Sequence, residues 1–265
     1  MTLVIPARRL TKASAVLVGV FITAGALAVA SNLAAPADGW GLVVAKALRQ
    51  FDLDREANIP TWYQSSALLV CAGLLWITAG VPQEERQRRH WRRIALVFVG
   101  LSIDEAAALH EMTITPLRSM LGARDFLASA WVVPGTLFVL VFALLSVRFL
   151  AALPARTRWQ FVAAGAIYVG SALGLECLEA HMLETSGARA LGFQATSFTQ
   201  ESGELLGILM FGFALLSHLR RHAGDVRIIF EPSRPPVRPA DPAPPLVLLA
   251  PSCRPRAVAA SGRRA

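Results

Sequence analysis

Charged residues are scarce in this chain: they make up 17% of its 265 residues, whereas soluble domains contain about 25%. Cysteines are also few, and Cys71, Cys177 and Cys253 have no short spacing, which excludes a disulfide framework and a cysteine zinc motif. The net charge of +8 does not indicate nucleic-acid binding, because the arginines are split among several segments without an aromatic-basic module. Hydrophobic residues reach 54%, which is typical of a membrane protein.

Six long apolar segments stand out along the chain. They cover residues 13–34, 64–81, 94–112, 128–151, 160–182 and 202–218. Most approach the ~20 residues that a helix needs to cross ~30 Å of hydrocarbon. The sequence therefore predicts an all-α fold, a polytopic helix bundle of about six transmembrane helices in a lipid bilayer.

The first apolar segment has two interpretations, and the sequence leaves both open. Arg8, Arg9 and Lys12 precede an apolar run that ends near small residues at 28–30 and 35–37, as in a secretory signal. The run is long for a signal peptide, however, which favours an uncleaved helix. Residue 40 lies outside the membrane in both cases.

Basic residues predict the orientation of the bundle. Most of them fall in alternate segments: residues 1–12, the loop 82–93, the region 148–158 and the Pro- and Arg-rich segment 223–265. The positive-inside rule places these segments in the cytoplasm, with both termini. The domain from 13 to 222 then carries a periplasmic loop at 35–63, in which Trp40 to Phe51 have the spacing of a short interfacial helix. Residues 223–265 are expected to be a disordered tail.

Acidic residues concentrate inside the apolar segments and at their outer ends. A charge inside a bilayer costs at least ~2.5 kcal/mol on insertion scales, so such residues are usually functional. In the helix predicted over residues 94–112, Asp104 and Glu111 share a face, while Glu105 and His110 point to other sides. The predicted topology brings the following groups to one level: Asp104, Glu105, His110, Glu111, Glu176, Glu179, His181, Glu201 and Glu204.

The leading hypothesis is a site for a divalent metal ion in a membrane enzyme that acts on a lipid-like or other small molecule. Carboxylates and imidazoles from several helices are ligands of zinc, iron and manganese. The predicted metal ligands are Asp104, His110, Glu176, Glu179 and His181, with Asp104, Glu105 and Glu179 as acids or bases. The expected supporting residues are Glu111, Glu201, Glu204 and three carboxylates of the outer loop, Asp52, Asp54 and Glu56.

Other functions fit parts of the same pattern. Buried carboxylates can act as the relay of a proton- or cation-coupled transporter, although no inverted repeat is evident. His110 and His181 lie at similar predicted depth, as axial haem ligands would. Ser102, Asp104, His110 and His181 match part of the Ser, Asp and His set of ceramidase-like membrane hydrolases. The Glu-x-x-His spacing of di-iron bundles is absent from the acidic segments.

Two strings carry a family resemblance. FDLDREANIPTWY at residues 51–63 and LSIDEAAALHE at residues 101–111 resemble the motifs of a family of uncharacterised bacterial polytopic membrane proteins. The resemblance covers about residues 15–220. It implies a multi-pass protein of the bacterial inner membrane and leaves the chemistry open.

Overall fold

The computed structural model describes residues 2–4, 7–34, 38–223 and 227–229. Residues Leu3–Ile228 form one compact unit. Apart from 223 and 227–229, the segment predicted as a disordered tail lies outside the described residues.

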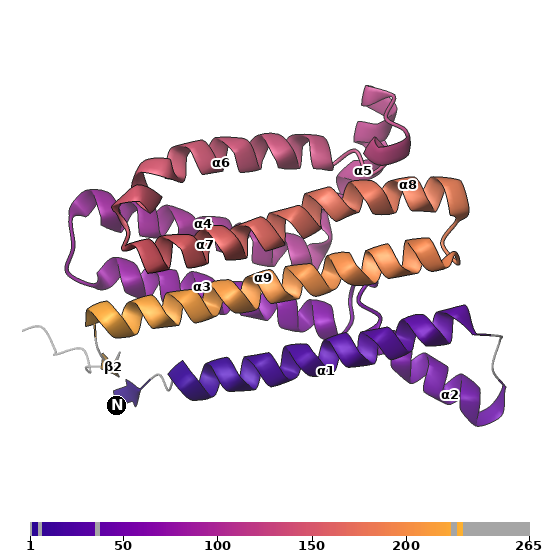
Figure 1. Ribbon diagram of the computed structural model, residues 1–265, viewed down its shortest axis with the longest axis horizontal. Coiled ribbons are helices and arrows are strands. Elements are labelled where there is room, and N and C mark those ends of the chain that lie inside the picture. Colours follow the sequence, from indigo (N-terminus) through magenta and orange to yellow (C-terminus); the bar gives the residue numbers. More distant parts are fainter. Residues whose placement is uncertain (1, 5–6, 35–37, 224–226, 230–265) are drawn as a thin grey trace, which may run out of the picture. The chain divides into compact units, whose positions relative to one another are not determined.

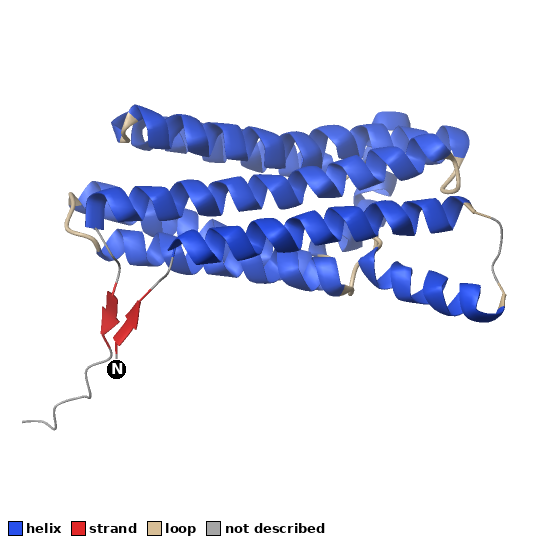
Figure 2. Cartoon of the chain, turned by 60° about the horizontal axis from the view of Figure 1, so that its bottom comes forward, coloured by secondary structure: helices blue, strands red, loops and turns tan. Residues whose placement is uncertain are grey.

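Helices make up nearly all of this unit (Figures 1 and 2). Two three-residue strands, β1 (Thr2–Val4) and β2 (Arg227–Ile229), pair with each other. The first half contains α1 (Ala7–Leu33), α2 (Gly39–Leu48), the 3-10 turn η1 (Arg49–Phe51), α3 (Ile59–Gly80), α4 (Glu85–Ala107) and α5 (Leu109–Leu121). The second half contains the 3-10 turn η2 (Asp125–Leu127), α6 (Val132–Ala152), α7 (Ala155–Val169), the π-helical turn η3 (Gly170–Leu175), α8 (Glu176–Ser186) and α9 (Leu191–Ala223).

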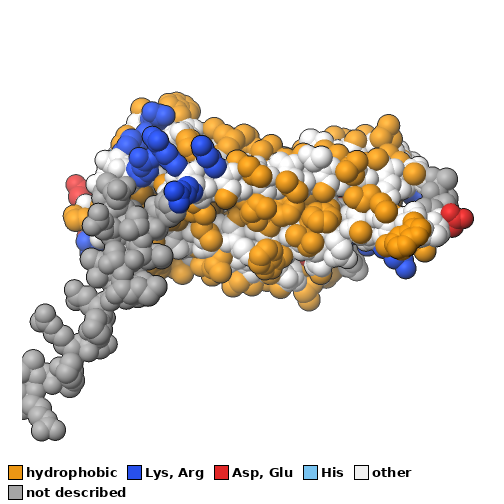
Figure 3. Space-filling view, turned by 90° about the horizontal axis from the view of Figure 1, so that it is seen from below, with side chains coloured by type: hydrophobic (Ala, Val, Ile, Leu, Met, Phe, Trp, Pro, Cys, Tyr) orange, Lys and Arg blue, Asp and Glu red, His pale blue; other side chains and the backbone are white. Residues whose placement is uncertain are grey.

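Five helical stretches are long and apolar enough to cross a membrane. They are Ala7–Leu33, Ile59–Gly80, Val132–Ala152, Ala155–Ser186 and Leu191–His222. In Figure 3, hydrophobic side chains are spread along the length of the helices, whereas most Lys and Arg side chains gather at one end. The predicted fold class, a polytopic membrane bundle of helices, is therefore confirmed.

The third predicted span differs from the structure. Helix α4 starts among arginines at Glu85 and ends at Ala107, and Ala108 then adopts a left-handed conformation with φ of 50°. A new helix, α5, begins at Leu109. The assumption of one helix through residues 94–112 was wrong, so the argument that Asp104 and Glu111 share a helical face does not hold. The number of membrane crossings stays a prediction.

Helix α2 occupies the place predicted for a short helix in the first loop. None of its residues is buried, and Trp40, Val43 and Val44 expose much of their side chains. This bears out the predicted helix. Its location at a membrane interface stays a prediction.

Helix α9 lies among α1, α3 and α7, as Figure 1 shows. The C-terminal half of α9 contributes Leu215 and Leu219 to a hydrophobic core around Trp91 of α4. The Trp91 side chain is 1% exposed, and its ring packs edge-on against the rings of Phe149 and Phe161. The core therefore joins α4, α6, α7 and α9 at the end that carries the α3–α4 turn.

Two glycines let α9 pack closely against α7 and the π-helical turn η3. A Cβ added at Gly203 would meet the Ser171 hydroxyl, and one at Gly207 would lie 2.8–3.0 Å from Cβ, N and Cα of Tyr168. The two glycines are four residues apart, the spacing that lets membrane helices pack backbone to backbone. Glu204 lies between the two glycines in the sequence, and its Oε2 accepts an N–H from Gln64 of α3.

We therefore expect Gly207→Ala to destabilise the protein by about 1–3 kcal/mol, because the added methyl group must displace the Tyr168 backbone. Thermal unfolding in detergent measures the effect. Gly165→Ala is the matched control, since a Cβ there has no neighbour within 4 Å. Equal behaviour of the two variants would contradict the close packing.

Candidate functional site

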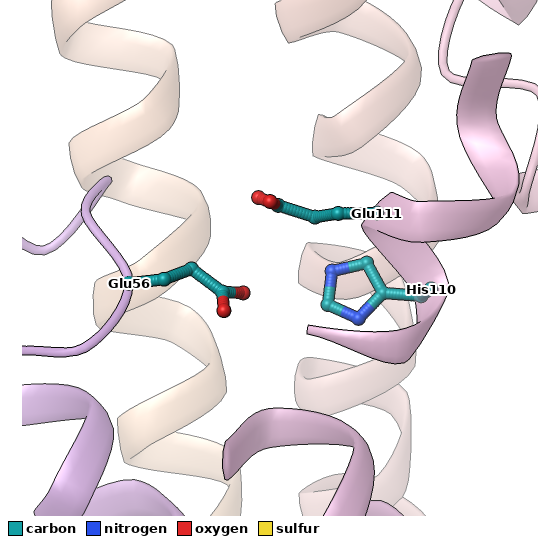
Figure 4. A group of neighbouring side chains, drawn as sticks. All are labelled: Glu56, His110 and Glu111. Carbon is teal, nitrogen blue, oxygen red and sulfur yellow. The ribbon is translucent and has the colours of Figure 1, made fainter. Parts of the chain in front are cut away.

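One imidazole and two carboxylates converge near the junction of α4 and α5. One ligand atom from each of Glu56, His110 and Glu111 lies within 4.8 Å of the other two, and this is the one such acidic or histidine group among the described residues. Figure 4 shows the two carboxylate ends and the ring directed toward one another. The carboxylates come from different elements, because Glu56 lies in the loop before α3 and Glu111 in the first turn of α5.

The loop that carries Glu56 is held by Asn58. The Asn58 side chain accepts a hydrogen bond from the Thr61 backbone N–H at 3.0 Å, which caps α3, and donates to the Asp52 carbonyl oxygen at 2.6 Å. Pro60 fits the first turn of α3, where its missing N–H needs no partner. The string at residues 51–63 thus builds a fixed turn.

Asp104 orients His110. Its Oδ1 accepts the His110 backbone N–H at 2.9 Å, and its Oδ2 lies 3.0 Å from Nδ1 of the same residue. The first bond caps the start of α5 after the turn at Ala108. The second makes Nδ1 the donor to Asp104, so that Nε2 is the nitrogen that could bind a metal ion once it has released its proton. The sequence had assigned Asp104 as a ligand and base, but both of its oxygens face His110.

The charges around this group favour a protonated imidazole. Burial by itself would lower the pKa of His110, but the hydrogen bond that its ring donates to Asp104 and the charges of Asp104, Glu56 and Glu111 raise this pKa to about 9. Burial and the charge of Glu111 raise the pKa of Glu56, against the opposing effect of His110. Without another cation, the group is an ion-paired network with one positive ring.

A second polar group lies between α8 and α9. Glu176 accepts an N–H from Gln200 at 2.9 Å and the indole N–H of Trp131 at 3.3 Å, one on each oxygen. Glu204 accepts an N–H from Gln64 of α3 at 3.3 Å, and both of these side chains are buried. Four separate segments thus meet at these carboxylates.

The loop before α3 reaches α9 through Asp54 and α1 through Asp52. Asp54 accepts a hydrogen bond from the Ser197 hydroxyl of α9 at 2.6 Å, and its carboxyl group lies within hydrogen-bonding reach of Glu179. Asp52 accepts from Asn32 of α1 at 3.0 Å. The loop carboxylates are therefore fastened to the bundle.

The remaining predicted residues have separate surroundings. His181 stacks on Phe126 at 4.2 Å between ring centroids, and its buried Nδ1 has no hydrogen-bond partner. Glu105 lies within hydrogen-bonding reach of Gln64, and Glu201 lies near Glu204 and Glu105. Ser102 is buried and exchanges hydrogen bonds with Ser65, so it has a packing role.

Of the five predicted metal ligands, the structure joins Asp104 to His110 and leaves Glu176, Glu179 and His181 with other partners. Glu56 and Glu111, predicted as supporting residues, take the places next to the ring. Sequence reasoning missed Gln64, Trp131 and Gln200, which bond the buried carboxylates. Polar residues within apolar segments are the signal that points to the two glutamines.

Comparison with known proteins places the chain in a family. The family model described as Domain of unknown function (DUF8692) matches residues 8–219. The chain belongs to this family. The match covers the whole helical bundle and ends before the Pro- and Arg-rich segment. No curated protein and no solved structure matches the chain.

Proposed function

We propose that this protein of the DUF8692 family is a metal-dependent membrane enzyme, with a divalent metal ion held by Glu56, His110 and Glu111. The observation that carries the proposal is the contact between Asp104 and His110. Histidines that bind metals almost always donate their other ring N–H to a carboxylate or carbonyl, which fixes the tautomer. Asp104 has this position relative to His110.

The donor set fits a metal of the first transition row or zinc. One imidazole nitrogen and two carboxylates form a set that such ions accept, with room for water or substrate as further ligands. A bound ion of this kind polarises a carbonyl or phosphoryl oxygen or activates water. The protein would hold the ion through Glu56, Glu111 and Nε2 of His110.

The surroundings favour a lipid-like substrate. Leu109 and Met112 flank the two α5 ligands and expose much of their side chains, and Ile59 and Trp62 do so at the start of α3. Apolar side chains beside a polar centre suit a molecule with a hydrophobic tail and a polar head. Glu105 and Glu179 remain candidates for proton transfer.

We further propose that this end of the bundle faces the periplasm of a bacterial inner membrane. In Figure 1, α2, α5 and the α8–α9 connection lie at one end, opposite the α3–α4 and α6–α7 connections. The latter connections adjoin Arg86, Arg88, Arg156 and Arg158. Positive loops remain cytoplasmic, which supports this orientation.

Proton- or cation-coupled transport is the second candidate function. It is favoured by the carboxylates of Glu176 and Glu204, which lie between helices with amide partners. Substrate flux that depends on a pH gradient in proteoliposomes, without bound metal in the protein, would favour transport over the enzyme.

Calorimetric titration of the purified protein with Zn²⁺ and Mn²⁺ tests the metal site. We expect one ion per chain, with binding to Glu56→Gln weaker by about tenfold or more, since one ligand loses its charge. Glu85→Gln is the control, because Glu85 pairs with Arg88 at the other end of the bundle. Equal binding by all three proteins would contradict the site.

A further inference from the structure

The carboxyl group of Glu176 is held by two N–H donors from other segments. Both of its oxygens accept N–H hydrogen bonds, from Trp131 at 3.3 Å and from Gln200 at 2.9 Å. Glu204 accepts a similar bond from Gln64 through Oε2.

Neither carboxyl group forms an ion pair in the part of the chain that the structure describes. The ion pairs found there involve Asp52, Glu85, Asp104 and Glu184, and none includes Glu176 or Glu204. Glu204 is 7% exposed. A buried charge is strongly destabilising unless an opposite charge compensates it.

Gln200 supplies an independent sign of a missing positive partner. This side chain is 6% exposed, and its Oε1 accepts no hydrogen bond from any described residue although its Nε2 binds Glu176. A buried oxygen without a partner costs about 1–3 kcal/mol, so native proteins rarely leave one. Its place on the amide beside Glu176 makes it available to a ligand there.

Local backbone structure adds to this picture. The π-helical turn η3 (Gly170–Leu175) ends immediately before Glu176, and Gly203 lets α9 approach this turn at Ser171. π-helical turns interrupt the regular carbonyl pattern of a helix and occur frequently at functional sites. The π-helical turn η3 therefore lies next to Glu176, the residue that Gln200 binds through its amide nitrogen.

We propose that Glu176, Gln200 and Glu204 bind a hard cation of the alkali or alkaline-earth class between α8 and α9. All of these donors are oxygens, and carboxylates with amide carbonyls are the ligands that such cations prefer. This site is separate from the nitrogen-containing group around His110. The cation neutralises the carboxylates of Glu176 and Glu204 and gives Gln200 Oε1 a partner.

Thermal unfolding of the full chain in detergent tests this site. The midpoint temperature is measured in Na⁺ or Ca²⁺ and in choline at equal ionic strength. A chelator for transition metals is present in every sample. We expect one of the two cations to raise Tm by roughly 3 °C or more, as a ligand that binds only the folded state does. Glu204→Gln and Gln200→Met should lose this increase, whereas Glu85→Gln should keep it.

Three results would overturn the proposal: no cation-specific increase in the wild type, an unchanged increase in both variants, or stabilisation by lower pH alone with choline as effective as Na⁺ and Ca²⁺. The last result would assign charge neutralisation to protons. If Glu204→Gln does not fold, Gln200→Met decides. His110→Ala should keep the increase, so this site and the proposed metal site fail or succeed separately.

Discussion

Replacement of His110 by alanine is expected to weaken Zn²⁺ binding by about 100-fold or more. His110 is the nitrogen ligand of the proposed site, and its ring is held in place by Asp104 at 3.0 Å. Loss of a residue that merely orients a ligand already costs about 10–100-fold in metal affinity, so loss of the ligand itself should cost more. Titration of the purified variant with Zn²⁺ measures the change.

His181→Ala is the matched control for this prediction. His181 was also predicted from the sequence as a metal ligand. Its ring stacks on Phe126 and does not belong to the group formed by Glu56, His110 and Glu111. We expect its affinity for Zn²⁺ to match that of the wild type. Equal losses in both variants would restore the wider ligand set predicted from the sequence and contradict the three-residue site.

The second large effect is on the pH dependence of metal affinity. The pKa of His110 is about 9, because Asp104, Glu56 and Glu111 outweigh the burial that by itself would lower it. A metal ion binds only the neutral ring, so the ring must release a proton. Below about pH 9 the affinity for Zn²⁺ should therefore fall about tenfold per pH unit, or about 100-fold between pH 8 and pH 6.

Asp104→Asn tests the cause of this dependence. Asparagine removes the charge that raises the pKa of His110, so the slope of affinity against pH should flatten in the upper part of this range. In the metal-free wild type, the raised pKa stabilises the fold fully below about pH 6.5, and this stabilisation disappears as pH rises through about 9. Zn²⁺ titrations at several pH values decide, and a pH-independent affinity would contradict the account.

The helical class of the fold could be predicted because apolar runs of about 20 residues have few other solutions in a bilayer. The break at Ala108 could not. The apolar pattern of residues 94–112 predicts one helix. Alanine seldom adopts the left-handed conformation, so Ala108 gives no sequence signal for a turn. The turn exists because Asp104 caps the next helix through the His110 backbone N–H, a tertiary arrangement that hydropathy does not encode.

The sequence predicted that carboxylates of the loop and of the helices lie close together, and Asp54 of the loop does bond to Ser197 of α9. Their common level in a membrane stays a prediction, and the individual partners of these carboxylates could not be predicted. Which carboxylate meets His110 depends on the turn that Asn58 fixes and on the direction of α5 after Ala108. Glu56 was therefore expected beside the site and is found within it.

Elemental analysis of the protein, purified in detergent without added metal, tests the central claim most directly. We expect close to one divalent transition metal ion per chain in the wild type. The variant carrying both Glu56→Gln and His110→Ala should contain little or none. The control variant Glu85→Gln should contain as much metal as the wild type. A folded wild-type protein without metal above background would contradict the metal site. It would favour the alternative function, in which the carboxylates act in proton or cation transport.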